Sequence, residues 1–192
     1  MIGEKDIEAL FEKQLARISN RELRGKVVKT FVLACRRGKW ESVDSLKKMP
    51  FTLLTDTLGV NFVEHTIAVT EGAAALGRAQ AEAYGRLPYA IDFDRLYAGG
   101  LLHDVGKLLE IELDGRGGFR KSLPGKYARH PVSGAILASE CELPGDILNI
   151  IVCHAKEGEG RPQVIEAVLI HQADFATFDP LVMKQKGNLI EP

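Results

Sequence analysis

The residues of this chain best suited to chemistry are a histidine and an aspartate that stand side by side, His103 and Asp104. They lie in the otherwise apolar stretch Gly99–Leu108, and the pattern on both sides predicts a helix from about Phe93 to Glu110. Burying an unpaired carboxylate costs much free energy, so Asp104 needs a cationic partner there. A divalent metal ion is a partner that both side chains can bind. The alternative is a structural pair, in which a salt bridge neutralises Asp104 beside a core histidine.

Lys107 follows His103 by four residues and Asp104 by three, so it projects from the same side of the predicted helix. Its ammonium group is then close to any metal ion at Asp104, in a place where it can bind a phosphate oxygen. We therefore expect Asp104 and Lys107 to be catalytic, and Lys107 also to contact the substrate.

The remaining histidines lie on or beside other predicted helices. Together with the central pair, His65 and Asp174 can supply one cation with two imidazoles and two carboxylates. His130 and His154 can supply a second cation, with Asp104 as the bridge. Mixed nitrogen and oxygen ligands suit Mn, Fe, Co, Ni or Zn better than Ca, and Mg stays in the set. The sequence therefore predicts one or two divalent metal ions.

His171 precedes Asp174 by three residues and shares its helix face. It can contact substrate and donate a proton, or it can serve only to support and pack its neighbours. Both interpretations stay open.

Apolar residues recur at helical spacing along nearly the whole chain, and no window alternates as a half-buried strand does. We therefore predict an all-α fold. Asn20 and either Asp92 or Asp94 are candidate helix caps, and Gly38 is placed to end a helix. The predicted helices cover residues 5–18, 20–38, 58–84, 93–110, 130–138, 145–154 and 163–178.

The chain divides into three regions on this pattern. Residues 1–55 form a helical extension packed on the core, residues 56–182 form the main domain, and residues 183–192 form a loose tail. The N-terminal helices can either cover the core or form the interface of a homodimer. Residues 114–121, with three glycines and three basic side chains, predict an irregular, mobile and basic loop near the site, a candidate lid.

Composition restricts the classes of function. The net charge of −1 gives no basic excess for strong nucleic-acid binding. The charged start of the chain lacks a signal peptide's apolar region, and no apolar run is long enough to span a membrane. Three cysteines without paired spacing indicate reduced thiols. We therefore expect a cytoplasmic protein, and the position of Lys107 beside a metal ion favours a small phosphorylated substrate as its partner.

The order His65, His103-Asp104, Asp174 resembles the HD superfamily of metal-dependent phosphohydrolases. The stretch 103–107, His-Asp-Val-Gly-Lys, is similar to the HD-[IV]-G-K signature of that superfamily, and the resemblance covers about residues 60–180. His130 and His154 match the two extra histidines of its binuclear subset, which includes cyclic-nucleotide phosphodiesterases. Residues 122–174 are also similar in layout to the HD domain of the ribonuclease Y family.

The resemblance implies an HD-domain helical bundle with an N-terminal helical extension. It also implies hydrolysis of a phosphoester, of a nucleotide or cyclic nucleotide, by a phosphodiesterase or nucleotidase. A metal-activated water would attack phosphorus, and Asp104 would both ligate the metal and orient that water. A second hypothesis keeps the same site in a regulatory module that binds a nucleotide without turning it over. The intact set of ligand residues favours the enzyme.

Overall fold

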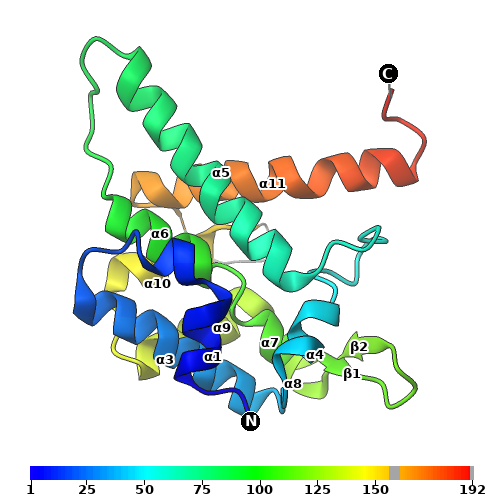
Figure 1. The fold of residues 1–192 in the computed structure, drawn as a ribbon. Helices are drawn as coiled ribbons and strands as arrows, with labels where there is room; N and C mark the ends of the chain where they lie inside the picture. The colour runs from blue at the N-terminus through cyan, green and yellow to red at the C-terminus, as the bar shows by residue number, and fades with distance from the viewer. Residues whose placement is uncertain (156–160, 191–192) are drawn as a thin grey trace.

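The computed structural model of this chain describes residues 1–155 and 161–190, and helices dominate it (Figure 1). The all-α prediction is confirmed, with one small hairpin added. The helices are α1 (Glu4–Leu10), α2 (Glu12–Leu15), α3 (Arg21–Arg37), α4 (Val43–Lys48), α5 (Phe62–Ala83), α6 (Phe93–Leu102), α7 (Lys107–Glu110), α8 (Leu123–Tyr127), α9 (His130–Glu140), α10 (Gly145–Cys153) and α11 (Ile165–Gln185). The strands are β1 (Ile111–Leu113) and β2 (Phe119–Lys121).

Short polar side chains begin the helices that the sequence marked. The Asn20 side chain accepts a hydrogen bond from the backbone of Leu23 and starts α3, and Gly38 ends that helix. Asp92, rather than Asp94, caps α6. Asn61 caps α5, so the first turn of that helix, which carries His65, is held in place from its start.

The long helices α5 and α11 pack against one another and against α6 (Figure 1). The contact between α5 and α6 is close because Gly100 faces Thr70. A Cβ atom on Gly100 would lie 2.9 Å from the Thr70 hydroxyl oxygen and 3.0 Å from its Cα. This close approach brings the end of α6, with His103, to the first turns of α5.

The predicted helix over residues 93–110 is wrong in its middle, because a turn over residues 103–106 separates α6 from α7. At this turn the chain runs against α9. A Cβ atom on Gly106 would lie only 2.1 Å from the carbonyl oxygen of His130 and 2.6 Å from the nitrogen of Gly134. His103 and Asp104 therefore stand at a break between helices, where both can face one point.

Two other predicted elements also differ from the structure. Residues 114–121 are not wholly irregular, because 119–121 form β2, which pairs antiparallel with β1. Strands of three residues are too short to show an alternating pattern. The first predicted helix, 5–18, is interrupted at Phe11, whose backbone leaves the helical region between α1 and α2.

The N-terminal helices share one hydrophobic core with the rest of the protein. Helix α3 packs against α6, α7 and α9. The Trp40 indole donates a 2.8 Å hydrogen bond to the carbonyl oxygen of Leu108, just beyond the central turn. At the other end of the chain, α11 continues through residues 183–185, which the sequence placed in the tail. Within the described residues, no helix combines the length and apolarity needed to cross a bilayer.

Candidate metal centre

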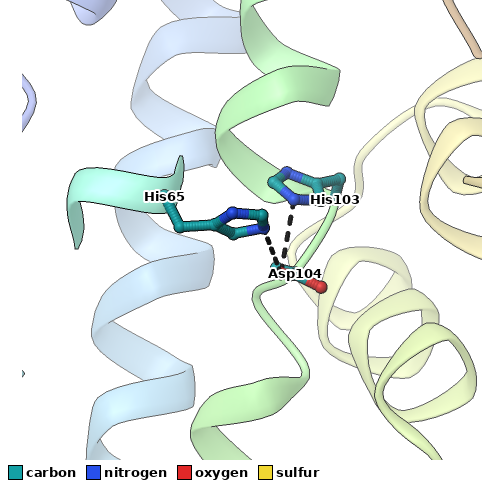
Figure 2. A group of neighbouring side chains, drawn as sticks. All are labelled: His65, His103 and Asp104. Carbon is teal, nitrogen blue, oxygen red and sulfur yellow. Dashed lines mark ion pairs between the residues drawn. The ribbon is translucent and has the colours of Figure 1, made fainter. Parts of the chain in front are cut away.

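Four histidines from different elements converge on Asp104. His65 lies in the first turns of α5, His103 ends α6, His130 begins α9, and His154 ends α10. Figure 2 shows the rings of His65 and His103 turned toward Asp104. All of these side chains are buried. The structure therefore brings together five residues that the sequence singled out.

Each carboxylate oxygen of Asp104 faces one pair of histidines. Oδ2 lies 3.3 Å from Nε2 of both His65 and His103. Oδ1 lies 3.3 Å from Nε2 of His130 and 3.4 Å from Nε2 of His154. Each pair forms a group with Asp104 in which all three donor atoms lie within 4.8 Å of one another. The two groups share only the carboxylate of Asp104.

The second ring nitrogen fixes the tautomer of three of these histidines. Nδ1 of His103 lies 2.6 Å from the carbonyl oxygen of Gly100, and Nδ1 of His154 lies 2.8 Å from that of Ile151. A carbonyl can only accept, so both Nδ1 atoms carry the proton. Nδ1 of His130 is held in the same way, 3.1 Å from Oε2 of Glu110. Nε2 of each ring is therefore left with a lone pair.

The orientation of His65 depends on α11. The Thr177 hydroxyl donates to the carbonyl oxygen of Asp174 at 2.8 Å, which uses its only proton. It lies 3.3 Å from Nδ1 of His65 and therefore accepts from that atom. Nε2 of His65 is left as an acceptor, like that of the other three rings. Phe51 stacks on the same imidazole, with ring centroids 4.0 Å apart.

With these tautomers, the Nε2 atoms of the four histidines and the Asp104 carboxylate are hydrogen-bond acceptors that face one another in the protein interior. Nε2 of His130 lies 3.3 Å from Nε2 of His154. Within the described residues, Nε2 of His65, Nε2 of His103 and Oδ1 of Asp104 have no hydrogen-bond partner. Such a cluster is costly unless a cation lies between the atoms. Two donors that each bind one ion at about 2.1 Å lie roughly 3.0–3.4 Å apart, so the observed spacing fits divalent metal ions.

Asp174 lies at the side of the first group. Its Oδ1 is 3.2 Å from Nε2 of His65, although it does not belong to the compact group of three donors. Burial alone would raise the pKa of Asp174, but the contact with His65 and the charge of Lys107 outweigh burial, and the pKa falls to about 2. Asp174 is therefore a carboxylate at neutral pH and can complete the ligand set from α11.

Lys107 contacts the bridging carboxylate directly. Its Nζ lies 2.6 Å from Oδ2 of Asp104 and 5.5 Å from the centre of the Phe51 ring. Burial would raise the pKa of Asp104, but the charge of Lys107 holds that pKa well below its ordinary value. The lysine thus keeps the central carboxylate ionised, and Lys107 also lines the adjoining cavity.

His171 is placed differently from the other histidines. Its Nδ1 donates to the carbonyl oxygen of His154 at 2.5 Å, and its ring lies beside Phe175. It does not belong to either donor group, nor to the residues that line the cavity next to the metal centre. This position matches the supporting alternative for His171, since the ring holds the backbone that carries His154.

Glu110 is a residue of the site that the sequence pattern did not indicate. Its Oε2 accepts hydrogen bonds from the backbone nitrogen of His130 at 2.7 Å and from Nδ1 at 3.1 Å. Its Oε1 lies 2.9 Å from Nε of Arg129 and 3.2 Å from Nζ of Lys121. Burial would raise the pKa of Glu110, but the His130 hydrogen bonds lower it to about 2. A glutamate between the apolar residues Leu109 and Ile111 was the available signal.

A cavity of about 570 Å³ opens beside the metal centre. Its walls come from the segment after α4, from α7 and the hairpin, from the start of α9, and from α11. The residues that line it are Phe51, Thr52, Leu53, Leu54, Lys107, Glu110, Ile111, Lys121, Arg129, His130, Ala155, Asp174, Phe175, Phe178 and Asp179. The centre is therefore accessible from a space large enough for a small organic ligand.

Comparisons with known proteins agree with this geometry. The sequence model of the HD domain family matches residues 62–176. Ribonuclease Y of Pseudothermotoga lettingae is 30% identical over 168 residues, which are 88% of this chain and 28% of that protein. Ribonuclease Y of Thermotoga petrophila is 34% identical over 116 residues, 60% of this chain and 18% of that protein.

This chain thus spans less than a third of the length of these relatives. No solved structure matches it. The family match covers more than half of the chain and includes every residue of the two donor groups as well as Asp174. The order of its histidines and aspartates resembles that of the superfamily of metal-dependent phosphohydrolases, and the chain therefore belongs to the HD domain family.

Proposed function

We propose that this protein hydrolyses a phosphoester of a nucleotide and that two divalent metal ions share Asp104. The observation that carries the proposal is the position of this carboxylate, which is fully buried and directs one oxygen toward each pair of histidines. A structural salt bridge with Lys107 alone would not require four neutral imidazoles with their free nitrogens turned to the same point.

The residues around Asp104 divide between the two ions. His65, His103, Asp104 and Asp174 would hold the first ion, and His130, His154 and Asp104 would hold the second. The bound ions would supply an activated water and would neutralise charge on the phosphate. Burial lowers the pKa of His130, which keeps this imidazole in the neutral form that a metal requires.

The chain's own groups position the substrate. Lys107 reaches the cavity with a fixed positive charge, so it can bind a non-bridging phosphate oxygen and stabilise the charge that develops there. Asp104 would orient the attacking water toward the phosphorus atom. Glu110 and Thr177 fix the orientation of His130 and His65 and so keep the ligand nitrogens turned toward the centre.

The cavity and the relatives support two classes of ester. A space of about 570 Å³ accommodates a nucleotide. The relatives are named ribonuclease Y, a name that specifies RNA as their substrate. A phosphodiester in RNA is therefore the second candidate substrate, and sequence similarity over 88% of this chain favours it.

The test compares bis(p-nitrophenyl) phosphate, p-nitrophenyl phosphate and a short RNA with the manganese-loaded protein. We expect hydrolysis of the diester, and loss of activity by at least a thousandfold in Asp104→Ala, about the effect of removing a central catalytic group. Circular dichroism checks that the variant keeps its helices. Cleavage of the monoester alone would indicate a nucleotidase, and cleavage of RNA alone would indicate a ribonuclease. Full activity in Asp104→Ala would refute the assignment, and bound metal without any turnover would favour the regulatory module.

A further inference from the structure

One wall of the cavity is apolar and comes mainly from segments outside the matched HD region. Phe51, Leu53 and Leu54 precede residue 62, where the family match begins, and Phe178 follows residue 176, where it ends. Leu53 is 43% exposed and Leu54 is 70% exposed. Large apolar side chains that line a cavity and remain in contact with water mark a surface that a ligand can cover.

The apolar wall begins at the metal centre and leads away from it. Phe51 stacks on the imidazole of His65. Phe178 lies next to Phe51, with ring centroids 6.4 Å apart and the rings nearly perpendicular, at 89°. A ligand whose phosphate lies at Lys107 can therefore extend along Phe51 to Phe178. A phosphate group alone would leave most of the 570 Å³ unfilled.

A nucleobase suits this wall better than a sugar or an acyl chain. Bases stack on aromatic side chains, and each such contact is worth about 1–3 kcal/mol. An acyl chain would need an entirely apolar channel, whereas Asp179, next to Phe178 in the chain, also lines this cavity. Asp179 is exposed, and within the described residues it has no hydrogen bond or ion pair. It is therefore available to a ligand.

The carboxylate of Asp179 selects among bases by its chemistry. An ionised carboxylate can only accept hydrogen bonds. Adenine, cytosine and guanine carry an exocyclic amino group that donates to it. Uracil and thymine instead present one N–H between two carbonyl oxygens. The lone pairs of these oxygens repel the carboxylate.

We propose that Phe178 and Asp179 form a nucleobase subsite that accepts amino-bearing bases in preference to uracil and thymine. The proposal rests on the proposed function, because it takes the phosphate of a nucleotide to lie at the metal centre. It assigns the specificity of the site to α11 just beyond the matched HD region, whereas the reaction belongs to residues inside it.

The experiment measures kcat/KM for the p-nitrophenyl esters of AMP and UMP, with methyl p-nitrophenyl phosphate as the substrate without a base. We expect the AMP ester to be preferred over the UMP ester by about tenfold, the value of one well-made hydrogen bond. Asp179→Asn should bring the ratio close to one, because an amide both donates and accepts. Asp44→Asn, at an exposed aspartate in the first turn of α4, should leave the ratio unchanged.

A second variant tests the stacking surface. Phe178→Leu keeps an apolar side chain but removes the ring. We expect the advantage of the AMP ester over the methyl ester to fall about tenfold, within the range for one base–aromatic contact. Thermal unfolding followed by circular dichroism shows whether the variant is folded under the assay conditions.

The outcomes separate this proposal from the proposed function. Hydrolysis of all three esters with no base preference, unaffected by both variants, would overturn the subsite and leave the phosphohydrolase in place. If no ester or nucleotide is turned over, the proposed function fails, and calorimetric titration of the manganese-loaded protein with AMP and UMP decides the subsite. Equal affinities in that titration, unchanged by Asp179→Asn, would then overturn it.

Discussion

Glu110 links the second pair of histidines to the basic side of the cavity. One carboxylate oxygen holds His130 through two hydrogen bonds, and the other lies beside Arg129 and Lys121. A carboxylate that accepts from a ligand imidazole fixes the ring and strengthens the metal site. Glu110 therefore acts through His130, as a positioning residue.

We expect Glu110→Gln to weaken binding of the second metal ion about 10–100-fold, the usual effect of losing such a partner, while the first ion stays bound. Elemental analysis after dialysis against graded metal concentrations measures the stoichiometry. Glu112→Gln is the matched control, because Glu112 is a surface residue of β1 that pairs with Arg120. Equal loss of both ions in Glu110→Gln would show that the residue does not serve the second site in particular.

At the scale of the secondary-structure elements, the break between α6 and α7 determines the arrangement of the residues at the candidate metal centre. It places His103 and Asp104 at the end of one helix and Lys107 at the start of the next. The N-terminal helices are attached just before this unit, since Asp94 in the first turn of α6 accepts hydrogen bonds from the backbone of Ser19 and Asn20 and from the Ser19 hydroxyl.

Asp94 should make stability depend on pH. Its burial raises the pKa, but the hydrogen bonds from Ser19 and Asn20 outweigh burial and lower it below the ordinary value. A carboxyl group with a lowered pKa stabilises the folded state above its unfolded pKa, and this contribution is lost as pH falls through the folded pKa. We expect Asp94→Ala to cost about 1–2 kcal/mol at pH 7, for the loss of hydrogen bonds to a charged group, and less below about pH 3.8.

Urea unfolding of both proteins between pH 2.5 and 7 measures this difference. A gap between wild type and Asp94→Ala that stays constant over the whole range would show that the charge of Asp94 is not involved. Asp44→Ala, at an aspartate in the first turn of α4, is the control for loss of a helix-terminal charge.

Local sequence signals predicted most of the elements but not their tertiary contacts. Asn20 and Asp92 marked helix starts, because a cap is a property of a few neighbouring residues. The break after His103 depends on the close contact of Gly106 with α9, which begins more than twenty residues later. Nothing in the sequence near Gly106 carries that information.

Prediction of the site also succeeded for residues with a local signal and failed for those defined by tertiary contacts. His65, His103, Asp104, His130 and His154 were found by residue type and order, and the structure brings them together. Phe51 could not be found, because an aromatic residue in an irregular stretch carries no signal that it stacks on His65. Glu110 was detectable only as a charge among apolar neighbours.

At the scale of the whole molecule, the centre exists only when distant segments have assembled. The candidate ligands lie in α5, at the ends of α6 and α10, in the turn before α7, at the start of α9 and in α11, and one continuous core joins these helices to the N-terminal ones. An unfolded chain cannot hold the same ligands together, so a metal ion that binds the folded state must stabilise it.

Manganese should therefore raise the midpoint of thermal unfolding. At a free concentration about a hundred times the dissociation constant, one ion adds about 2.7 kcal/mol. Differential scanning calorimetry of chelator-treated protein, with and without manganese, measures the shift, and a variant with both His65→Ala and His130→Ala should lose it. A shift of the same size in that variant would place the stabilising ion elsewhere.

The division of the cavity between the HD region and its flanks has a consequence for how this protein can diversify. Leu53, Leu54 and Asp179 line the cavity and, within the described residues, form no hydrogen bond, ion pair or ring contact with the histidines or Asp104, so substitutions at these three positions alter the wall of the cavity and leave the candidate ligands in place. Exchanging these three positions between homologues should change the proposed substrate preference and conserve the type of reaction. On the proposed function, substrate preference then varies at positions outside the matched HD region, while the reaction stays with the histidines and Asp104 inside it.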